Sequence, residues 1–87
     1  MKIDFPNKVL PKVTTIGTVS FQARMDGEYL WCEISCEALR DHFDAASLAE
    51  NDLLFAFHTG KAEIEQAARR QLELSAGRAV LLMKSDF

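Results

Sequence analysis

The fold of this 87-residue chain is decided by residues 19–34, which read VSFQARM-DG-EYLWCEI. Apolar side chains occupy alternate positions before Asp26-Gly27, and they alternate again after it. Such alternation is typical of a strand with one buried face. Asp-Gly suits a two-residue type I′ turn, because both central positions of that turn need φ > 0. Residues 18–34 are therefore predicted to form a β-hairpin.

The position of the turn also predicts the register of the hairpin, since a slip of one residue would move every side chain to the opposite face. The inner-face pairs are then Val19 with Ile34, Phe21 with Cys32, and Ala23 with Leu30. The outer face carries Gln22, Arg24, Tyr29 and Trp31, which include the only Tyr and the only Trp of the chain. Two aromatic side chains on one face need a cover. Either residues 1–16 fold over them, or a partner does.

The remaining elements are predicted from caps and helical spacing. Ser35 is a good N-cap for a short helix over 36–43. Ser47-x-x-Glu50 matches a capping box and begins a long helical pattern over 48–75. Gly60 lies inside that pattern and predicts a bend or two collinear pieces. A short strand over 79–84, with no polar alternation, is expected beside the hairpin and covered on both faces.

These elements give the order β-β-α-α-β, with an N-terminal edge strand as an option within the irregular residues 1–16. We therefore expect an α+β fold, in which the hairpin and the C-terminal strand pack against a short helix and a long or kinked helix. A chain of 87 residues has room for one domain, so residues 1–87 are expected to form a single unit.

Five motifs lie along the chain: Phe5-Pro6, Val19-x-Phe21-x-Ala23-x-x-Asp26-Gly27, Cys32-x-Ile34-Ser35-x-Glu37-Ala38-Leu39 with Phe43, Phe57-x-x-x-Lys61-x-x-Ile64-x-x-Ala67-Ala68, and Val80-Leu81-Leu82 with Asp86. Together these motifs resemble a family of short bacterial proteins catalogued as a domain of unknown function. Each is a core, cap or turn pattern. The resemblance implies no activity, because none is characterised for the family. Cys36 is not part of the family pattern.

Composition argues against several classes of protein. The net charge of −3, without a Lys/Arg cluster, argues against nucleic-acid binding. No apolar run approaches the roughly 20 residues that span a bilayer. Residues 1–6 lack the apolar stretch of a secretory signal. Two cysteines are fewer than a small secreted domain usually carries. A bacterial cytoplasmic location with reduced thiols is therefore expected, with no membrane partner.

Cys36, in the first turn of the short helix, is the candidate reactive thiol, because a helix N-terminus favours thiolate. Asp41 and His42 follow it along the helix. A zinc set of Cys32, Cys36, His42 and His58 fits no familiar spacing, and the four glycines form no phosphate-binding loop. No catalytic, metal or cofactor residues are therefore assigned.

The leading functional hypothesis is a small non-catalytic domain that binds a protein, including a second copy of itself, through Gln22, Arg24, Tyr29 and Trp31. The alternative is a small thiol-dependent or ligand-binding enzyme component that uses Cys36. A third hypothesis is a weak binder of single-stranded nucleic acid, with bases stacked on the same aromatic face.

Overall fold

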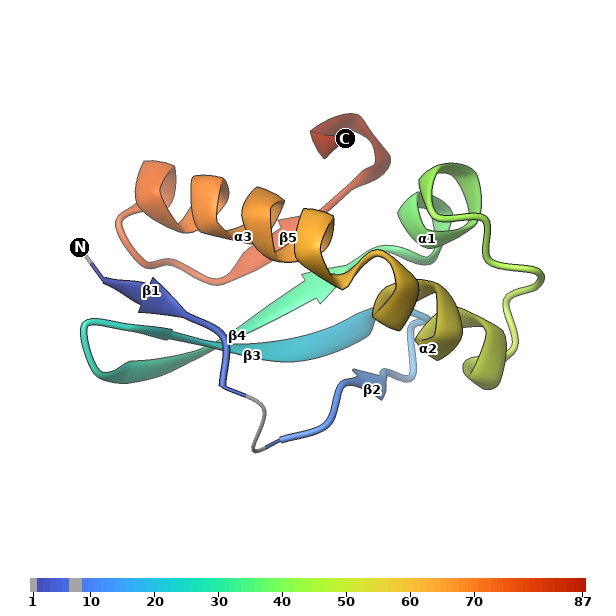
Figure 1. Ribbon diagram of the computed structural model, residues 1–87, viewed down its shortest axis with the longest axis horizontal. Helices are drawn as coiled ribbons and strands as arrows, with labels where there is room; N and C mark the ends of the chain where they lie inside the picture. Colours follow the sequence, from blue (N-terminus) through green and yellow to red (C-terminus); the bar gives the residue numbers. More distant parts are fainter. Residues whose placement is uncertain (1, 7–8) are drawn as a thin grey trace.

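The computed structural model describes residues 2–6 and 9–87, and it shows a mixed sheet with a layer of helices (Figure 1). Of the N-terminal segment predicted as irregular, Met1, Asn7 and Lys8 lie outside the described residues. The elements are β1 Ile3–Asp4, β2 Lys12–Val13, β3 Val19–Met25, β4 Glu28–Ile34, α1 Cys36–His42, α2 Glu50–Thr59, α3 Lys61–Ser75, β5 Val80–Leu82 and a final 3-10 turn, η1 Lys84–Asp86. The α+β class is confirmed.

The β3–β4 hairpin has the predicted register. Phe21 pairs with Cys32 on the inner face, and Gln22 pairs with Trp31 on the outer face. Asp26 and Gly27 at the turn both have positive φ, 52° and 88°, as a type I′ turn requires. Local turn geometry and side-chain alternation therefore agree with the tertiary structure here.

Two short strands occupy the other edge of β3. β1 pairs antiparallel with the end of β3 near the turn, and β2 pairs with its beginning. Arg69 of α3 donates a hydrogen bond of 2.6 Å to the carbonyl oxygen of Ile3, and its guanidinium lies 5.6 Å from the centroid of the Phe5 ring. The described N-terminal residues therefore join the edge of the sheet and reach toward the helices.

β5 lies beside β4 and runs parallel to it, with Leu81 opposite Glu33. A parallel neighbour needs a long crossover connection, and α1, α2 and α3 form it. The prediction that this strand is covered on both faces was wrong. Val80 and Leu82 are buried, whereas Leu81 is 50% exposed, because the helices cover only the inner face.

The hydrophobic core lies between the inner face of the sheet and the helices (Figure 1). The sheet contributes Ile3, Val19, Phe21, Ala23, Cys32, Ile34, Val80 and Leu82, and the helices contribute Ala38, Leu39, Leu53, Ala56, Phe57, Ile64, Ala67, Ala68 and Leu72. Most of these helical residues recur at spacings of three and four, which places them on one stripe. The buried side of α2 and α3 therefore follows the helical spacing of their apolar residues.

The long helical segment divides at Gly60 into α2 and α3. A continuous helix over 48–75 would be about 42 Å long, longer than the 36 Å greatest extent of the molecule. The ring of Phe43 occupies the space that a side chain at position 60 would need. The predicted capping box was wrong, because α2 begins at Glu50 with Ala49 as N-cap. The Ser47 hydroxyl instead donates to Asp52.

Candidate functional site

The outer face of the sheet exposes the two aromatic side chains that the sequence placed there. Tyr29 and Trp31 are each 52% exposed, on β4. Gln22 and Arg24 on β3 are half-buried beside them. Leu81 extends the apolar surface onto β5. We call these five residues the outer face.

Arg24 is held in place by Asp4 of β1. Its Nε and Nη2 donate to the Asp4 carboxylate at 3.0 and 2.5 Å, because β1 pairs Asp4 directly opposite Arg24. The Asp4 carboxylate, with a smaller contribution from Tyr29, raises the pKa of the guanidinium. The charge of Arg24 is therefore balanced within the fold, and its donors are oriented along the sheet.

The hypothesis that residues 1–16 cover the two aromatics is wrong for the described part of that segment. β2 and the following turn form one wall of a shallow hollow beside Trp31, together with Ser20 and Glu33. Glu33 accepts a hydrogen bond from the Thr18 hydroxyl. The N-terminal segment thus borders Trp31 and leaves half of its surface in contact with solvent.

The two cysteines lie in different environments. Cys32 is fully buried in the core, and burial raises the pKa of its thiol to about 11. Cys36 opens α1 and is half-buried, and its Sγ lies 3.9 Å from the Cβ position that a residue at Gly17 would have. Cys32 is therefore a small core residue, and Cys36 is the more accessible thiol.

Asp41 and His42 have partners other than Cys36. The Asp41 carboxylate accepts from Arg40 at 3.0 Å and pairs with Lys84 at 3.4 Å. The His42 imidazole lies 2.6 Å from Glu63 and stacks on the Phe87 ring. These contacts tie the end of α1 to α3 and to the C-terminal turn. Both side chains therefore have a structural role in this arrangement.

The zinc set considered from the sequence is not assembled in residues 2–6 and 9–87. No three His, Cys, Asp or Glu side chains among them come together in a way that could hold a metal ion. Among the same residues, no helix is both long and apolar enough to cross a bilayer.

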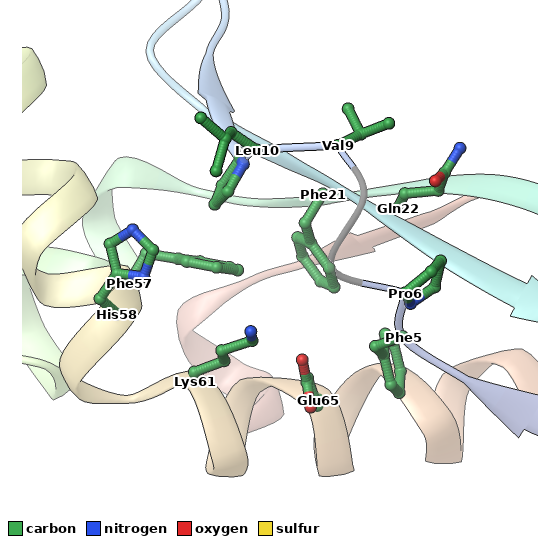
Figure 2. Close-up of a pocket in the computed structure, with 11 residues that line it drawn as sticks. Phe5, Pro6, Val9, Leu10, Phe21, Gln22, Phe57, His58, Lys61 and Glu65 are labelled. Carbon is green, nitrogen blue, oxygen red and sulfur yellow. The ribbon is translucent and has the colours of Figure 1, made fainter.

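A cavity of about 240 Å³ is the feature that sequence reasoning missed (Figure 2). Its aromatic wall is formed by Phe5, Phe21 and Phe57, with ring centroids 6.3 and 5.2 Å apart along that series. Lys61 and Glu65 of α3 also line the cavity, between Phe57 and Phe5 in Figure 2. Burial raises the pKa of Glu65, and Lys61 and Arg69 oppose that shift. Lys61 and Glu65 are four residues apart on α3, which places them on one helical face, whereas Phe57 belongs to α2, before the break at Gly60.

Comparison with known families shows a match over most of the chain. Residues 3–82 match the family described as Protein of unknown function (DUF1488). The chain belongs to this family. No curated protein and no solved structure matches the chain.

The DUF1488 match includes both surfaces described above. The outer face and the lining of the cavity lie within residues 3–82, whereas η1 and Phe87 lie beyond the match. The family description names no activity or partner. The residues of the outer face and of the cavity therefore carry the inference of function.

Proposed function

We propose that this DUF1488 chain is a non-catalytic binding domain whose outer face receives a second copy of the same chain. The observation that carries the proposal is the exposure of Tyr29 and Trp31, each 52% exposed on the same face of the sheet. Trp, Tyr and Arg are the residue types that dominate the energetics of protein interfaces. The outer face brings one of each together on adjacent strands.

Charge on the outer face favours a second copy as the partner. Asp4 balances Arg24, so the Arg24 side chains of two such faces can meet with reduced like-charge repulsion. A two-fold dimer would bury the same residues on both subunits. A typical interface covers about 800 Å² per partner, which is a modest share of the 5450 Å² total surface.

The test is the molecular mass in solution, measured by light scattering or sedimentation over a wide range of concentrations. We expect the mass to rise from 9.8 kDa toward twice that value, and the emission of the single tryptophan to shift to shorter wavelength as Trp31 becomes buried. A constant monomer mass with unchanged Trp31 emission would contradict the proposal.

A matched pair of variants locates the interface. Trp31→Ser on the outer face is expected to keep the chain monomeric. Phe55→Ser removes an aromatic that is 74% exposed on α2, away from the sheet, and is expected to leave self-association unchanged. Equal effects of both variants would show that general hydrophobicity, and not the outer face, drives association.

Two other functions have weaker support. A thiol-dependent component rests on the position of Cys36 in the first turn of α1, whereas Asp41 and His42 are engaged elsewhere. Single-stranded nucleic acid would need free basic groups beside the aromatics, and Arg24 is paired with Asp4. Bacterial cytoplasm is the proposed location, supported by two cysteines that form no disulfide.

A further inference from the structure

We propose that the cavity between the N-terminal segment, β3 and the junction of α2 with α3 binds a small uncharged molecule that carries an aromatic ring. Gln22 borders both this cavity and the outer face, whereas the exposed aromatics Tyr29 and Trp31 are not among the described residues that line the cavity. Ligand binding here goes beyond self-association and does not depend on it.

The cavity has room for one ring with a short substituent. Its volume is about 240 Å³, whereas a cavity of roughly 150 Å³ lined by apolar side chains already binds benzene. Phe5, Phe21 and Phe57 line it, with ring centroids 6.3 and 5.2 Å apart along that series. Aromatic rings make favourable tilted and offset contacts at such spacings. A bound ring would therefore extend a series of ring contacts that the fold already contains.

The charges beside the cavity offset each other within the chain. Figure 2 shows Lys61 and Glu65 next to each other on α3, between Phe57 and Phe5. Lys61 and Arg69 both oppose the rise that burial causes in the pKa of Glu65, so this carboxylate already interacts with two cations of its own helix. A charged ligand would lose hydration in the cavity and would compete with these internal interactions. An uncharged ligand avoids both costs.

Neutral and apolar side chains complete the lining. The amide of Gln22 carries hydrogen-bond donors and an acceptor, which suit a hydroxyl or amide substituent. Val9 and Leu10 line the cavity although they are 43% and 79% exposed, and Figure 2 shows both above the Phe21 ring. A ring bound in the cavity would cover part of this exposed apolar surface, which favours binding.

The first experiment compares two matched pairs of probes on the full chain, by calorimetry and by backbone amide chemical shifts. Each pair joins an uncharged probe to a charged one of similar shape: benzyl alcohol with benzylamine, and phenylacetamide with phenylacetate. The uncharged probes are expected to bind at millimolar concentration and to shift amides around Phe21, Phe57 and Leu10. Each is expected to bind at least about fivefold more tightly than its charged counterpart, because a charge is costly to bury without a partner.

Three results of this comparison would overturn the proposal. They are a charged probe that binds as tightly as its uncharged counterpart, no binding of either uncharged probe, and shifts confined to regions away from the cavity. Cyclohexylmethanol tests the aromatic requirement, and it is expected to bind more weakly than benzyl alcohol because ring–ring contacts add to the burial of apolar area. Equal or tighter binding of cyclohexylmethanol would overturn the assignment to aromatic ligands.

A matched pair of exposed aliphatic residues locates the bound probe. Leu10→Ser removes apolar surface at the cavity and is expected to weaken benzyl alcohol about threefold or more. Ile16→Ser removes a side chain that is similarly exposed, 77% against 79%, but is not among the described residues that line the cavity. It is expected to leave the affinity unchanged. Equal effects of the two variants would contradict binding in the cavity.

The offset between the charges is tested by Lys61→Met. Loss of this cation leaves the Glu65 carboxylate less balanced, so benzylamine is expected to gain affinity at least about threefold relative to benzyl alcohol. Arg70→Met removes an exposed cation of the same helix and is expected to leave the ratio of the two affinities unchanged. An unchanged ratio in Lys61→Met would overturn the argument that internal charge balance selects an uncharged ligand.

Trp31→Ser separates ligand binding from self-association. Benzyl alcohol is expected to bind this variant as tightly as the unaltered chain, with the same amide shifts. Loss of binding would place the probe on the outer face, which would overturn this proposal and leave self-association standing. A constant monomer mass of the unaltered chain, by contrast, would contradict self-association without affecting the cavity.

Discussion

Gly60 lies directly against the ring of Phe43: a Cβ atom at position 60 would fall 2.2 Å from Cδ1 of that ring. Phe43 is itself packed edge-on against His42 and Phe87, with centroids 4.8 and 5.0 Å away. The ring therefore has little freedom to move aside. The close approach joins α1 to the junction of α2 and α3, and it explains why glycine stands where the helix divides.

Gly60→Ala is expected to destabilise the fold by about 1–3 kcal/mol, the usual range for overpacking a tight site, although alanine is the better helix former by about 1 kcal/mol. In a Phe43→Ala background the same change is expected to be neutral or stabilising. Chemical denaturation of the four proteins of this cycle measures the coupling between the two positions. An identical effect of Gly60→Ala in both backgrounds would show that the Phe43 ring is not the cause.

The two serines that precede helices are expected to differ in their effect on stability. Ser35 is an N-cap whose hydroxyl accepts from the Ala38 backbone N–H at 3.1 Å, so Ser35→Ala is expected to lower the free energy of unfolding by about 1 kcal/mol. Ser47 lies before the N-cap of α2 and accepts from the Ala49 N–H. Ser47→Ala is expected to have less than half that effect. The denaturation midpoints of the two variants measure this difference. A larger loss of stability for Ser47→Ala than for Ser35→Ala would support the capping box predicted at Ser47.

Alkylation by iodoacetamide, read by mass spectrometry, is expected to modify Cys36 first. Cys32 is fully buried and its thiol pKa is raised to about 11 by burial, so it should react only after unfolding in urea. Reaction of Cys36 faster than that of a free model thiol would support the thiol-dependent alternative. A rate no faster than the model thiol would remove that alternative.

The raised thiol pKa of Cys32 also leads us to expect a loss of stability in alkaline solution. Its thiol pKa is raised from 9.0 to about 11 in the folded chain, so between these values the unfolded chain has released the proton and the folded chain has not. The free energy of unfolding should therefore fall as the pH rises through this window. A Cys32→Ala variant, compared at each pH, should lack this part of the decline, whereas Cys36→Ala should retain it.

Two ion pairs allow a matched measurement of carboxyl pKa values by NMR titration. The hydrogen bond from Arg24 lowers the pKa of Asp4, and the hydrogen bond from Arg40 lowers that of Asp41. Because each folded-state pKa is lowered, the stabilising contribution is present above the ordinary value of 3.8 and is lost as the pH falls. Arg24→Gln should raise the pKa of Asp4 alone, and Arg40→Gln that of Asp41 alone. A rise at both aspartates in either variant would contradict the pairing.

The predicted outer face depended on local information. Asp26-Gly27 defined the turn, and alternation in β3 and β4 then placed Tyr29 and Trp31 on the face opposite Phe21. Whether residues 1–16 cover that face could not be predicted from local patterns. Whether the N-terminal segment lies over Trp31 or at the edge of β3 depends on contacts such as Arg69 with Ile3, which join residues far apart in the sequence.

The cavity could not be predicted, for a related reason. Three separate segments contribute Phe5, Phe21 and Phe57. The sequence pattern does not distinguish any of them from an ordinary core residue. The unfilled space is bounded jointly by the described N-terminal residues, β3 and the junction of α2 with α3. Side-chain periodicity reports which face is buried, but it carries no information about how completely that face is packed.

The sequence by itself determined the hairpin with its register, the buried stripe of α2 and α3, the Ser35 cap and the α+β class, because each follows from interactions between residues close in the chain. Gly60 in the sequence also predicted the division between α2 and α3. The tertiary structure alone decided the parallel pairing and exposed face of β5, the close packing of Gly60 against Phe43, the exposure of Trp31 and the cavity beside Lys61 and Glu65. Those features depend on contacts between segments that are distant in the sequence, and these contacts form only when the whole chain packs.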